Sequence, residues 1–470
     1  TLGANVTFHY DIADRLDGAT RKEGTSGSTI TSAYSYDNAD RLTEIDYNSS
    51  STGHLSTFTY GYDPSGRVTS YTGPQGSRAY TYDNTDQLTT VTNGGSTVLE
   101  SFAYDANGNR TSAGGVSYST STGNRLTSDG YYSYTYDNEG NTLTKSQPGD
   151  YWQYSYDDRN RLTEAQELTG AGGTVVYDAQ YTYDVFNRRI GVHEDENPAG
   201  LGNGTDTVTQ LWTAYDRQNA WADYNGSGSL TMRYLNGQGM DERFARVTAG
   251  GTVGWYLTDD VNSVRQIVQT NGTVVYAASY TAFGTIASQT GTGGDRFKFT
   301  GREWDAGTGQ YYYRARYYGP SIGQFRKQDP VGFRTGDTNL YRYVANQPIL
   351  NSDPLGLWRV NIHLVAGEGF VTALDFSFGT GGIELETGVG VGVGSPVSGS
   401  VTIGPGTANP GTGLYTSVDL AFIGAFHADA NVVPLPPPGP VNRPGLGFWG
   451  GFGFGVGFIH ATWVAGIKWF

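Results

Sequence analysis

"YDNADRLT", residues 36–43, is one copy of a pattern that returns along the first part of this chain. Each copy has a Tyr-Asp pair, a short polar stretch, and then "RLT" or a variant of it. Most neighbouring copies begin 20 to 27 residues apart, and a degenerate copy, "YSTSTGNRLT", begins at 118. The signature pairs are Tyr10 and Asp11, Tyr36 and Asp37, Tyr62 and Asp63, Tyr82 and Asp83, Tyr104 and Asp105, Tyr136 and Asp137, Tyr156 and Asp157, and Tyr183 and Asp184.

Each copy predicts a β-hairpin. Strand-like segments with Tyr at every second position, such as "RAYTYD" (78–83), lead into the turn residues Asp, Asn, Pro and Gly. A single hairpin is marginal in water, so neighbouring copies are expected to pair edge to edge into a curved antiparallel wall. The tyrosines then form a packed ladder, or alternatively present rings that bind carbohydrate. The aspartates are expected to accept hydrogen bonds from nearby backbone N–H groups.

The composition narrows the range of functions. The 470 residues include 69 Gly and 35 Tyr, only 16% are charged, and the formal charge is −15. Nucleic acid is therefore an unexpected partner, because phosphate contacts need clustered Lys and Arg. Solubility is the simplest explanation for the excess of acidic residues, and calcium binding by the Asp side chains is the alternative. The chain has no Cys, and no apolar run is long enough for a membrane-spanning helix.

Two later stretches add a second signature. They are "FKFTGREWDAGTGQYYYRARYYGPSIGQFRKQDPVGF" (297–333) and "NLYRYVANQPILNSDPLGLW" (339–358). Together with the Tyr-Asp repeats they resemble the RHS or YD-repeat family, which includes bacterial Rhs proteins and the C components of Tc toxin complexes. The resemblance covers roughly residues 1–357. Two departures from the family pattern, Gly319 after "RYY" and "DDVNS" at 259–263, are expected to alter loops and not the fold.

The resemblance implies an all-β fold in which YD hairpins spiral into a shell or tube that an RHS core closes. We expect a repeat array over 1–200, the end of the shell and the core over 201–357, and a variable region over 358–470. Many family members cut their own chain just after the second DPxG box. Here the implied catalytic residues are Arg316, Asp329 and Asp353, and the implied scissile bond joins Leu357 to Trp358.

The chemistry is consistent with that implication. Two close carboxyls do not both ionise readily, so one can act as a base while the other supplies a proton. The alternative is purely structural, because Asp-Pro-x-Gly is also a good β-turn sequence.

Residues 358–470 alternate Gly with apolar residues and predict a Gly-rich β region without a recognisable effector enzyme or metal site. Three functions follow as hypotheses for a secreted or cell-surface protein. The first is a structural β-shell that assembles with copies of itself into an appendage or filament through this tail. The second is a self-cleaving toxin-type shell that delivers its C-terminal region. The third is an adhesin that binds cell-surface glycans.

Overall fold

The computed structural model describes residues 3–24, 27–198, 208–292 and 294–357, together with the backbone of six strands between residues 360 and 429. The chain divides into two units. The first comprises Thr1–Phe378 and Ile383–Pro405, and the second comprises Gly379–Gly382 and Gly406–Phe470. Each unit is considered by itself.

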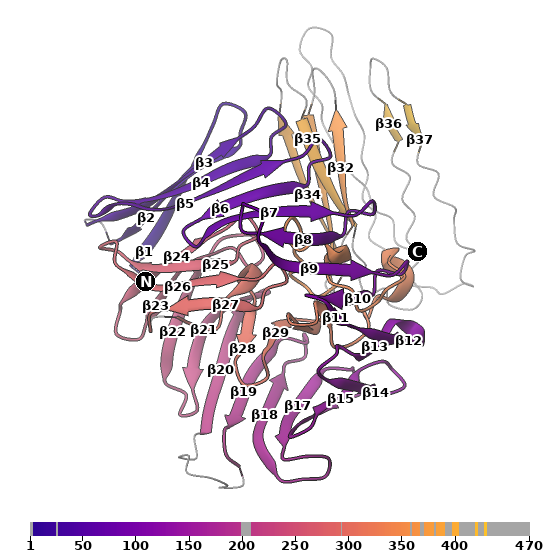
Figure 1. Ribbon diagram of the computed structural model, residues 1–470. Coiled ribbons are helices and arrows are strands. Elements are labelled where there is room, and N and C mark those ends of the chain that lie inside the picture. Colours follow the sequence, from indigo (N-terminus) through magenta and orange to yellow (C-terminus); the bar gives the residue numbers. More distant parts are fainter. Residues whose placement is uncertain are drawn as a thin grey trace, which may run out of the picture. The chain divides into compact units, whose positions relative to one another are not determined.

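The first unit begins with an 11-stranded antiparallel sheet in which every strand pairs with its neighbours in the sequence (Figure 1). Its strands are β1 (Ala4–Tyr10), β2 (Leu16–Glu23), β3 (Thr29–Tyr36), β4 (Leu42–Ser49), β5 (Gly53–Tyr62), β6 (Val68–Gly73), β7 (Gly76–Tyr82), β8 (Leu88–Thr92), β9 (Val98–Tyr104), β10 (Arg110–Ala113) and β11 (Val116–Ser117).

A 16-stranded sheet follows with the same sequential order. Its strands are β12 (Ser119–Ser121), β13 (Arg125–Ser128), β14 (Ser133–Tyr136), β15 (Thr142–Gln147), β16 (Asp150–Tyr156), β17 (Leu162–Leu168), β18 (Val175–Tyr183), β19 (Arg189–Asp195), β20 (Val208–Asp216), β21 (Asn219–Asn225), β22 (Leu230–Asn236), β23 (Arg243–Thr248), β24 (Val253–Thr258), β25 (Val264–Gln269), β26 (Val274–Tyr280) and β27 (Ile286–Thr290). In neither large sheet do the first and last strands pair with each other.

A small core follows the second sheet. It consists of a four-stranded sheet, β28 (Glu303–Asp305), β29 (Gln310–Tyr313), β30 (Arg316–Gly319) and β31 (Gln324–Phe325), with the 3-10 turns η2 (Phe299–Gly301), η3 (Gly332–Thr335) and η4 (Val344–Asn346). A further 3-10 turn, η1 (Thr122–Asn124), lies between β12 and β13.

After the core, β32 (Val360–Ala366) pairs with β35 (Val397–Ile403), and β33 (Val371–Gly379) pairs with β34 (Gly382–Gly390). In the second unit β36 (Asp419–Ala421) pairs with β37 (His427–Asp429). The predicted all-β fold with antiparallel hairpins is confirmed.

Separate apolar clusters join the two large sheets to each other and join the core to the second sheet. Ile45 and Phe58 of the first sheet pack in one cluster with Trp255 and Val268 of the second, and all four side chains are almost completely buried. Figure 1 shows the N-terminal strand β1 beside β24 of the second sheet, and Phe8 of β1 lies 5.4 Å from Phe244 of β23 between ring centres. Because these contacts join strands some 200 residues apart in sequence, hydrophobic burial brings the two sheets together.

The turn of each repeat is held by its aspartate, as predicted. In the copy at Asp157, carboxylate Oδ1 accepts from the backbone N–H groups of Arg159 and Arg161, both at 2.9 Å. Oδ2 accepts from Arg161 Nε at 2.7 Å. Asn160 has a left-handed backbone with φ of 56°. The third residue after each signature aspartate is accordingly Asp, Asn or Gly, the types that best tolerate this conformation.

The tyrosine of each repeat is tied to the repeat before it. The hydroxyl of Tyr36 donates to the Leu16 carbonyl at 2.8 Å, and that of Tyr62 donates to the Leu42 carbonyl at 2.7 Å. The same type of bond is made by Tyr82, Tyr104, Tyr136, Tyr156 and Tyr183. Tyr10 belongs to the first copy in this chain and is 60% exposed.

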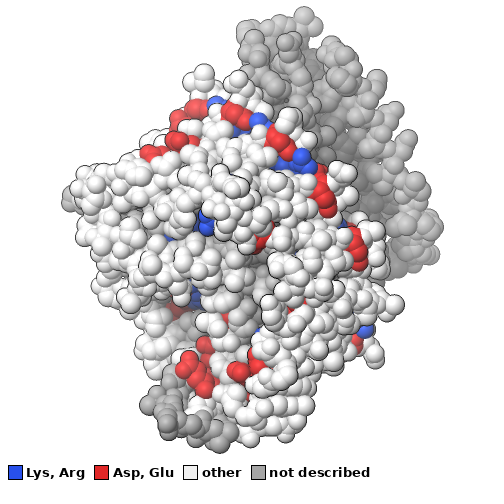
Figure 2. Space-filling model, viewed as in Figure 1, with Lys and Arg blue, Asp and Glu red and all other residues white. Residues whose placement is uncertain are grey.

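The arginine after the turn also contacts the turn of the following repeat, which the sequence pattern did not predict. Arg41 donates from Nε to Asp37 at 2.7 Å, and its Nη1 donates to the Asp63 carbonyl of the following turn at 2.9 Å. Its guanidinium also lies 4.7 Å from the ring centre of Tyr62. One arginine side chain therefore connects two successive turns. Figure 2 shows charged side chains of both signs gathered in a narrow band on a largely uncharged face.

The departure at 259–263 turns out to be another turn of this type. Asp259 Oδ1 accepts from the Ser263 N–H at 2.8 Å, and Oδ2 accepts from Arg265 Nε at 2.7 Å. Asn262 is left-handed, and Tyr280 donates to the Val264 carbonyl at 2.8 Å. The turn lacks the Tyr-Asp pair, and the sequence predicted a loop at 259–263 without predicting these contacts. The fold is kept, as expected for this departure.

Replacing Asp157 with alanine removes the acceptor of two backbone N–H groups and of one guanidinium. We expect the free energy of unfolding to fall by about 2 kcal/mol, because hydrogen bonds to a charged group are lost and two N–H donors are left without a partner. Urea-induced unfolding measures this loss. Asp158→Ala, at an exposed position of the same turn, is the control and should change stability by less than about 0.5 kcal/mol. Equal losses for the two variants would contradict the role of the carboxylate.

Candidate functional site

The first DPxG box forms a turn in the core. Asp329 donates its N–H to the Leu340 carbonyl at 2.9 Å and accepts from the Gly332 N–H at 2.9 Å through its own carbonyl. Its carboxylate Oδ1 accepts from the Val331 N–H at 2.9 Å. The other oxygen, Oδ2, contacts a side chain from elsewhere in the core.

The second DPxG box repeats this arrangement. The Asp353 carbonyl accepts from the Gly356 N–H at 3.0 Å, and Asp353 Oδ1 accepts from the Leu357 N–H at 2.9 Å. Gly356 has φ of +63°, and an added Cβ would lie 2.3 Å from the Tyr313 carbonyl oxygen. This close backbone approach requires glycine. Both boxes therefore make the turns that their sequence predicts.

Arg316, the first residue of β30, joins the two boxes. Its Nη2 lies 3.0 Å from Asp329 Oδ2 and 3.1 Å from Asp353 Oδ2. Its Nε donates to the Gly356 carbonyl at 2.6 Å, and its Nη1 donates to the Leu340 carbonyl at 3.1 Å. Arg316, Asp329 and Asp353 are 1%, 4% and 1% exposed. The structure thus brings the three predicted catalytic residues together.

The comparison with protein families matches two parts of this chain, residues 4–195 and 248–349, to the family described as teneurin YD-shell. The chain belongs to the teneurin YD-shell family. The matched residues hold most strands of both large sheets of this YD-shell protein, and they include Arg316 and Asp329. The similarity to RHS and YD-repeat proteins inferred from the sequence is confirmed.

Individual relatives are similar over part of the YD-shell. The tRNA3(Ser)-specific nuclease WapA of Bacillus spizizenii is 28% identical over 281 residues, which are 58% of this chain and 10% of that protein. The toxin protein Tse5 of Pseudomonas aeruginosa is 26% identical over 258 residues, 50% of this chain and 19% of that protein. The chain therefore spans between a tenth and a fifth of the length of these relatives.

Solved structures show the same fold. A crystal structure of TcdB2-TccC3 without its hypervariable C-terminal region has a TM-score of 0.58 and 20% identity over 75% of this chain and 20% of that chain. The Photorhabdus luminescens Tc holotoxin pore gives the same four values.

The buried YD-shell site makes the carboxyl group of Asp353 harder to ionise. Burial raises the pKa of Asp353; Arg316 opposes that rise, and the nearby Asp329 charge adds to it. Because one guanidinium faces two carboxyls, a single proton shared between them would balance the charge. The arrangement can therefore hold one ionised and one protonated carboxyl side by side.

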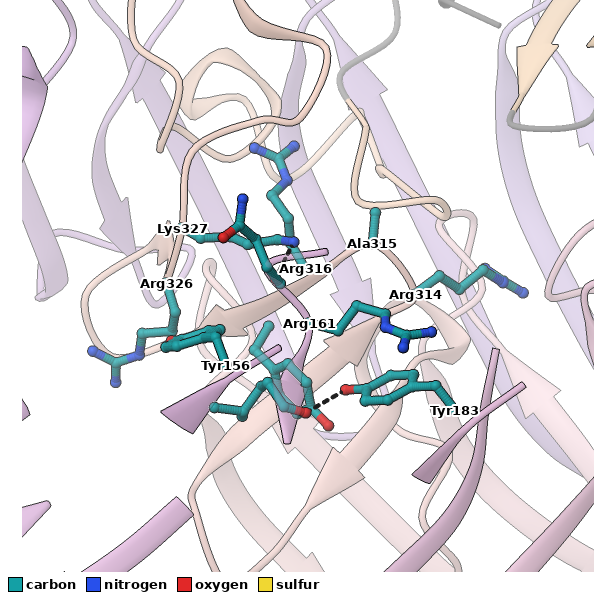
Figure 3. A pocket seen from close by; sticks show the side chains of 11 residues that line it. Tyr156, Arg161, Tyr183, Arg314, Ala315, Arg316, Arg326 and Lys327 are labelled. Carbon is teal, nitrogen blue, oxygen red and sulfur yellow. Dashed lines mark hydrogen bonds between the residues drawn. The ribbon is translucent and has the colours of Figure 1, made fainter. Parts of the chain in front are cut away.

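A small pocket borders this site on the side of β17 (Figure 3). Its lining includes Arg161, Arg314, Arg316 and Lys327, so its wall is strongly basic. Lys327 donates to the Asn160 carbonyl at 2.5 Å, and burial lowers the pKa of its ammonium to about 8. The pocket thus places several cationic side chains next to the site.

Three further predictions concern the bond to be cut, calcium binding and membrane-spanning helices. Leu357 is buried at the end of the second box, whereas Trp358, its partner in the scissile bond, lies outside the described residues. Among the described residues no three His, Asp or Glu side chains are grouped so as to hold a metal ion, and calcium binding stays a prediction. In that same part of the chain, no helix is both long and apolar enough to cross a membrane.

Gly356→Ala and Gly332→Ala form a matched pair, because the two glycines have φ of +63° and +65°. Each substitution places alanine in a left-handed conformation, at a cost of about 1–2 kcal/mol. A Cβ at Gly332 would meet nothing within 4 Å, whereas that at Gly356 would meet the Tyr313 carbonyl. We expect thermal unfolding to show a further loss of about 1–3 kcal/mol for Gly356→Ala. Indistinguishable stabilities would argue against the close approach.

The raised pKa of Asp353 predicts how stability changes with pH. The folded chain keeps this proton to a higher pH than the unfolded chain, so the contribution is complete below the ordinary Asp range and is lost as pH rises through the raised pKa. Asp353→Asn stays neutral throughout. Its melting temperature should therefore fall less than that of the unaltered protein as pH is raised from acidic to neutral. Parallel pH profiles for the two proteins would refute this assignment.

Proposed function

We propose that this chain is a secreted or cell-surface YD-shell protein that cuts itself between Leu357 and Trp358 and so separates residues 358–470 from the shell. The observation that supports this most directly is the contact of one buried arginine with two aspartates, one of which also accepts from the Leu357 N–H. The contact with the Leu357 N–H supports a cut directly after this residue.

In the proposed reaction, ionised Asp329 takes a proton from a water molecule, whose oxygen attacks the Leu357 carbonyl carbon. Asp353, which burial keeps protonated to higher pH, supplies a proton to the Trp358 nitrogen as the C–N bond breaks. The hydroxyl from water ends on the Leu357 carbonyl carbon and the proton from Asp353 ends on the Trp358 nitrogen. The proton taken up by Asp329 then passes to Asp353, which restores the starting state of the pair. Because enzyme and substrate are one chain, the bond is presented at high effective concentration, which reduces the catalytic power that the residues must supply.

Contacts within the repeats bear on one of the other two hypotheses, the binding of glycans. Most signature tyrosine hydroxyls are already bonded to carbonyls of the neighbouring repeat, which supports a packed ladder over glycan binding. Assembly with copies of itself through the tail stays a prediction, because most of 358–470 lies outside the described residues. Relatives with toxin in their names, such as the toxin protein Tse5, support a toxin-type shell.

The test is denaturing electrophoresis of the full chain, with mass spectrometry of any fragments. The unaltered chain should yield one fragment ending at Leu357 and one beginning at Trp358. Asp329→Asn and Asp353→Asn should each leave a single 50.6 kDa species, since each removes one of the two proton carriers. Asp305→Asn alters another buried aspartate of the core, one paired with Arg189 at 3.3 Å, and should still be cut. A single 50.6 kDa species from the unaltered chain would reject the proposal.

A further inference from the structure

We propose that Arg314 is a positioning residue for this cleavage: it fixes the carbonyl of Pro354 and thereby sets the register of the peptide that is cut. The inference rests on the proposed self-cleavage. Arg314 itself does not touch the reacting bond, and its effect is exerted through the chain that leads to Leu357.

Three consecutive residues of the core hold three consecutive carbonyls of the second box. Residues 314–316 donate, in order, to the carbonyls of residues 354–356. The contacts are Arg314 Nη1 to Pro354, the Ala315 N–H to Leu355 at 3.1 Å, and Arg316 Nε to Gly356 at 2.6 Å. With the Leu357 N–H bound to Asp353, the peptide is fixed on every residue up to the scissile bond. A shift by one residue would break all of these contacts together.

Arg314 is itself held rigidly. Its guanidinium meets Asp241 with two parallel contacts, Nη1 to Oδ2 at 2.9 Å and Nη2 to Oδ1 at 2.7 Å. Nη2 also donates to the Gln218 carbonyl at 3.0 Å. A planar guanidinium bound in this way has a defined direction as well as a position, which a lysine ammonium does not. The donor aimed at Pro354 is therefore fixed before the peptide is cut.

The anchor of this arginine belongs to the second large sheet. Asp241 precedes β23 and is 3% exposed; Arg302 of the core contacts the same carboxylate, at 2.6 Å. Although burial opposes ionisation, Arg302 and Arg314 hold the pKa of Asp241 below its usual range. Removal of Arg314 would leave Asp241 paired with Arg302, so the variant is expected to fold. The backbone of Arg314, with φ of 55°, lies at the turn between β29 and β30.

The experiment follows the full chain from its synthesis by cell-free translation with a short radioactive pulse, and measures how fast the two fragments form. We expect Arg314→Ala to slow cutting by roughly 10- to 100-fold, the range that a misplaced reacting group can cost. Arg314→Lys should also be slow, because it restores charge but not the paired contacts. Added methylguanidinium should accelerate Arg314→Ala but not Arg314→Lys. The shape of the pH profile should stay unchanged, since Asp329 and Asp353 remain.

Arg188→Met is the control, because Arg188 also binds an aspartate, with its Nε and Nη2 both on Asp184 Oδ2, but does so in a repeat turn. It should be cut at the unaltered rate. Cutting of Arg314→Ala at that same rate, or slow cutting without rescue by methylguanidinium, would overturn the role of Arg314 while leaving the proposed function intact. Failure of the unaltered chain to cut would overturn both. Loss of rate on removing only Asp241, in Asp241→Asn, would support the anchor separately.

Discussion

The carboxylate that accepts two backbone N–H groups within its own turn is the constraint on which the YD-shell depends. It closes each hairpin, and its second oxygen orients an arginine such as Arg41. That arginine then reaches the carbonyl of Asp63 and the ring of Tyr62 in the next repeat. A one-residue slip of a strand would turn its side chains to the other face of the sheet. The repeated arginine contact therefore fixes register between hairpins as well as within them.

Arginine and aspartate are used differently in the turns and in the core. In the turns each pair is partly exposed, as for Arg67 and Asp63, and such pairs contribute little stability singly. In the core Arg316 is buried and has four partners: two carboxyls and two carbonyls. A buried guanidinium with so many contacts cannot move without leaving a charge unpaired. Arginine–aspartate contacts thus recur from turn to turn near the surface, whereas in the core they hold one defined geometry.

Much of the fold could be predicted from the sequence, and less of the site. The hairpins and both DPxG turns follow from residues two to four positions apart, and the structure contains them. A loop at 259–263 was expected, but the contact between Asp259 and Arg265 was not, because the usual Tyr-Asp pair is absent there. The division into two large sheets was also missed, since the strands on either side of Tyr118 continue the same alternating pattern. Arg314 carried no signal at all, because its partner Asp241 lies 73 residues away.

The sequence by itself determined where the chain turns and which way each strand faces, because those outcomes depend on hydrogen bonds between near neighbours such as Asp157 and Arg161. Only the tertiary structure decided which carboxylates meet Arg316. Asp353 lies 37 residues from that arginine and reaches it because the core folds back between the sheets. Burial then changes the behaviour of that carboxyl, since the free energy of an ionised group depends on the solvent and charges that packing leaves around it.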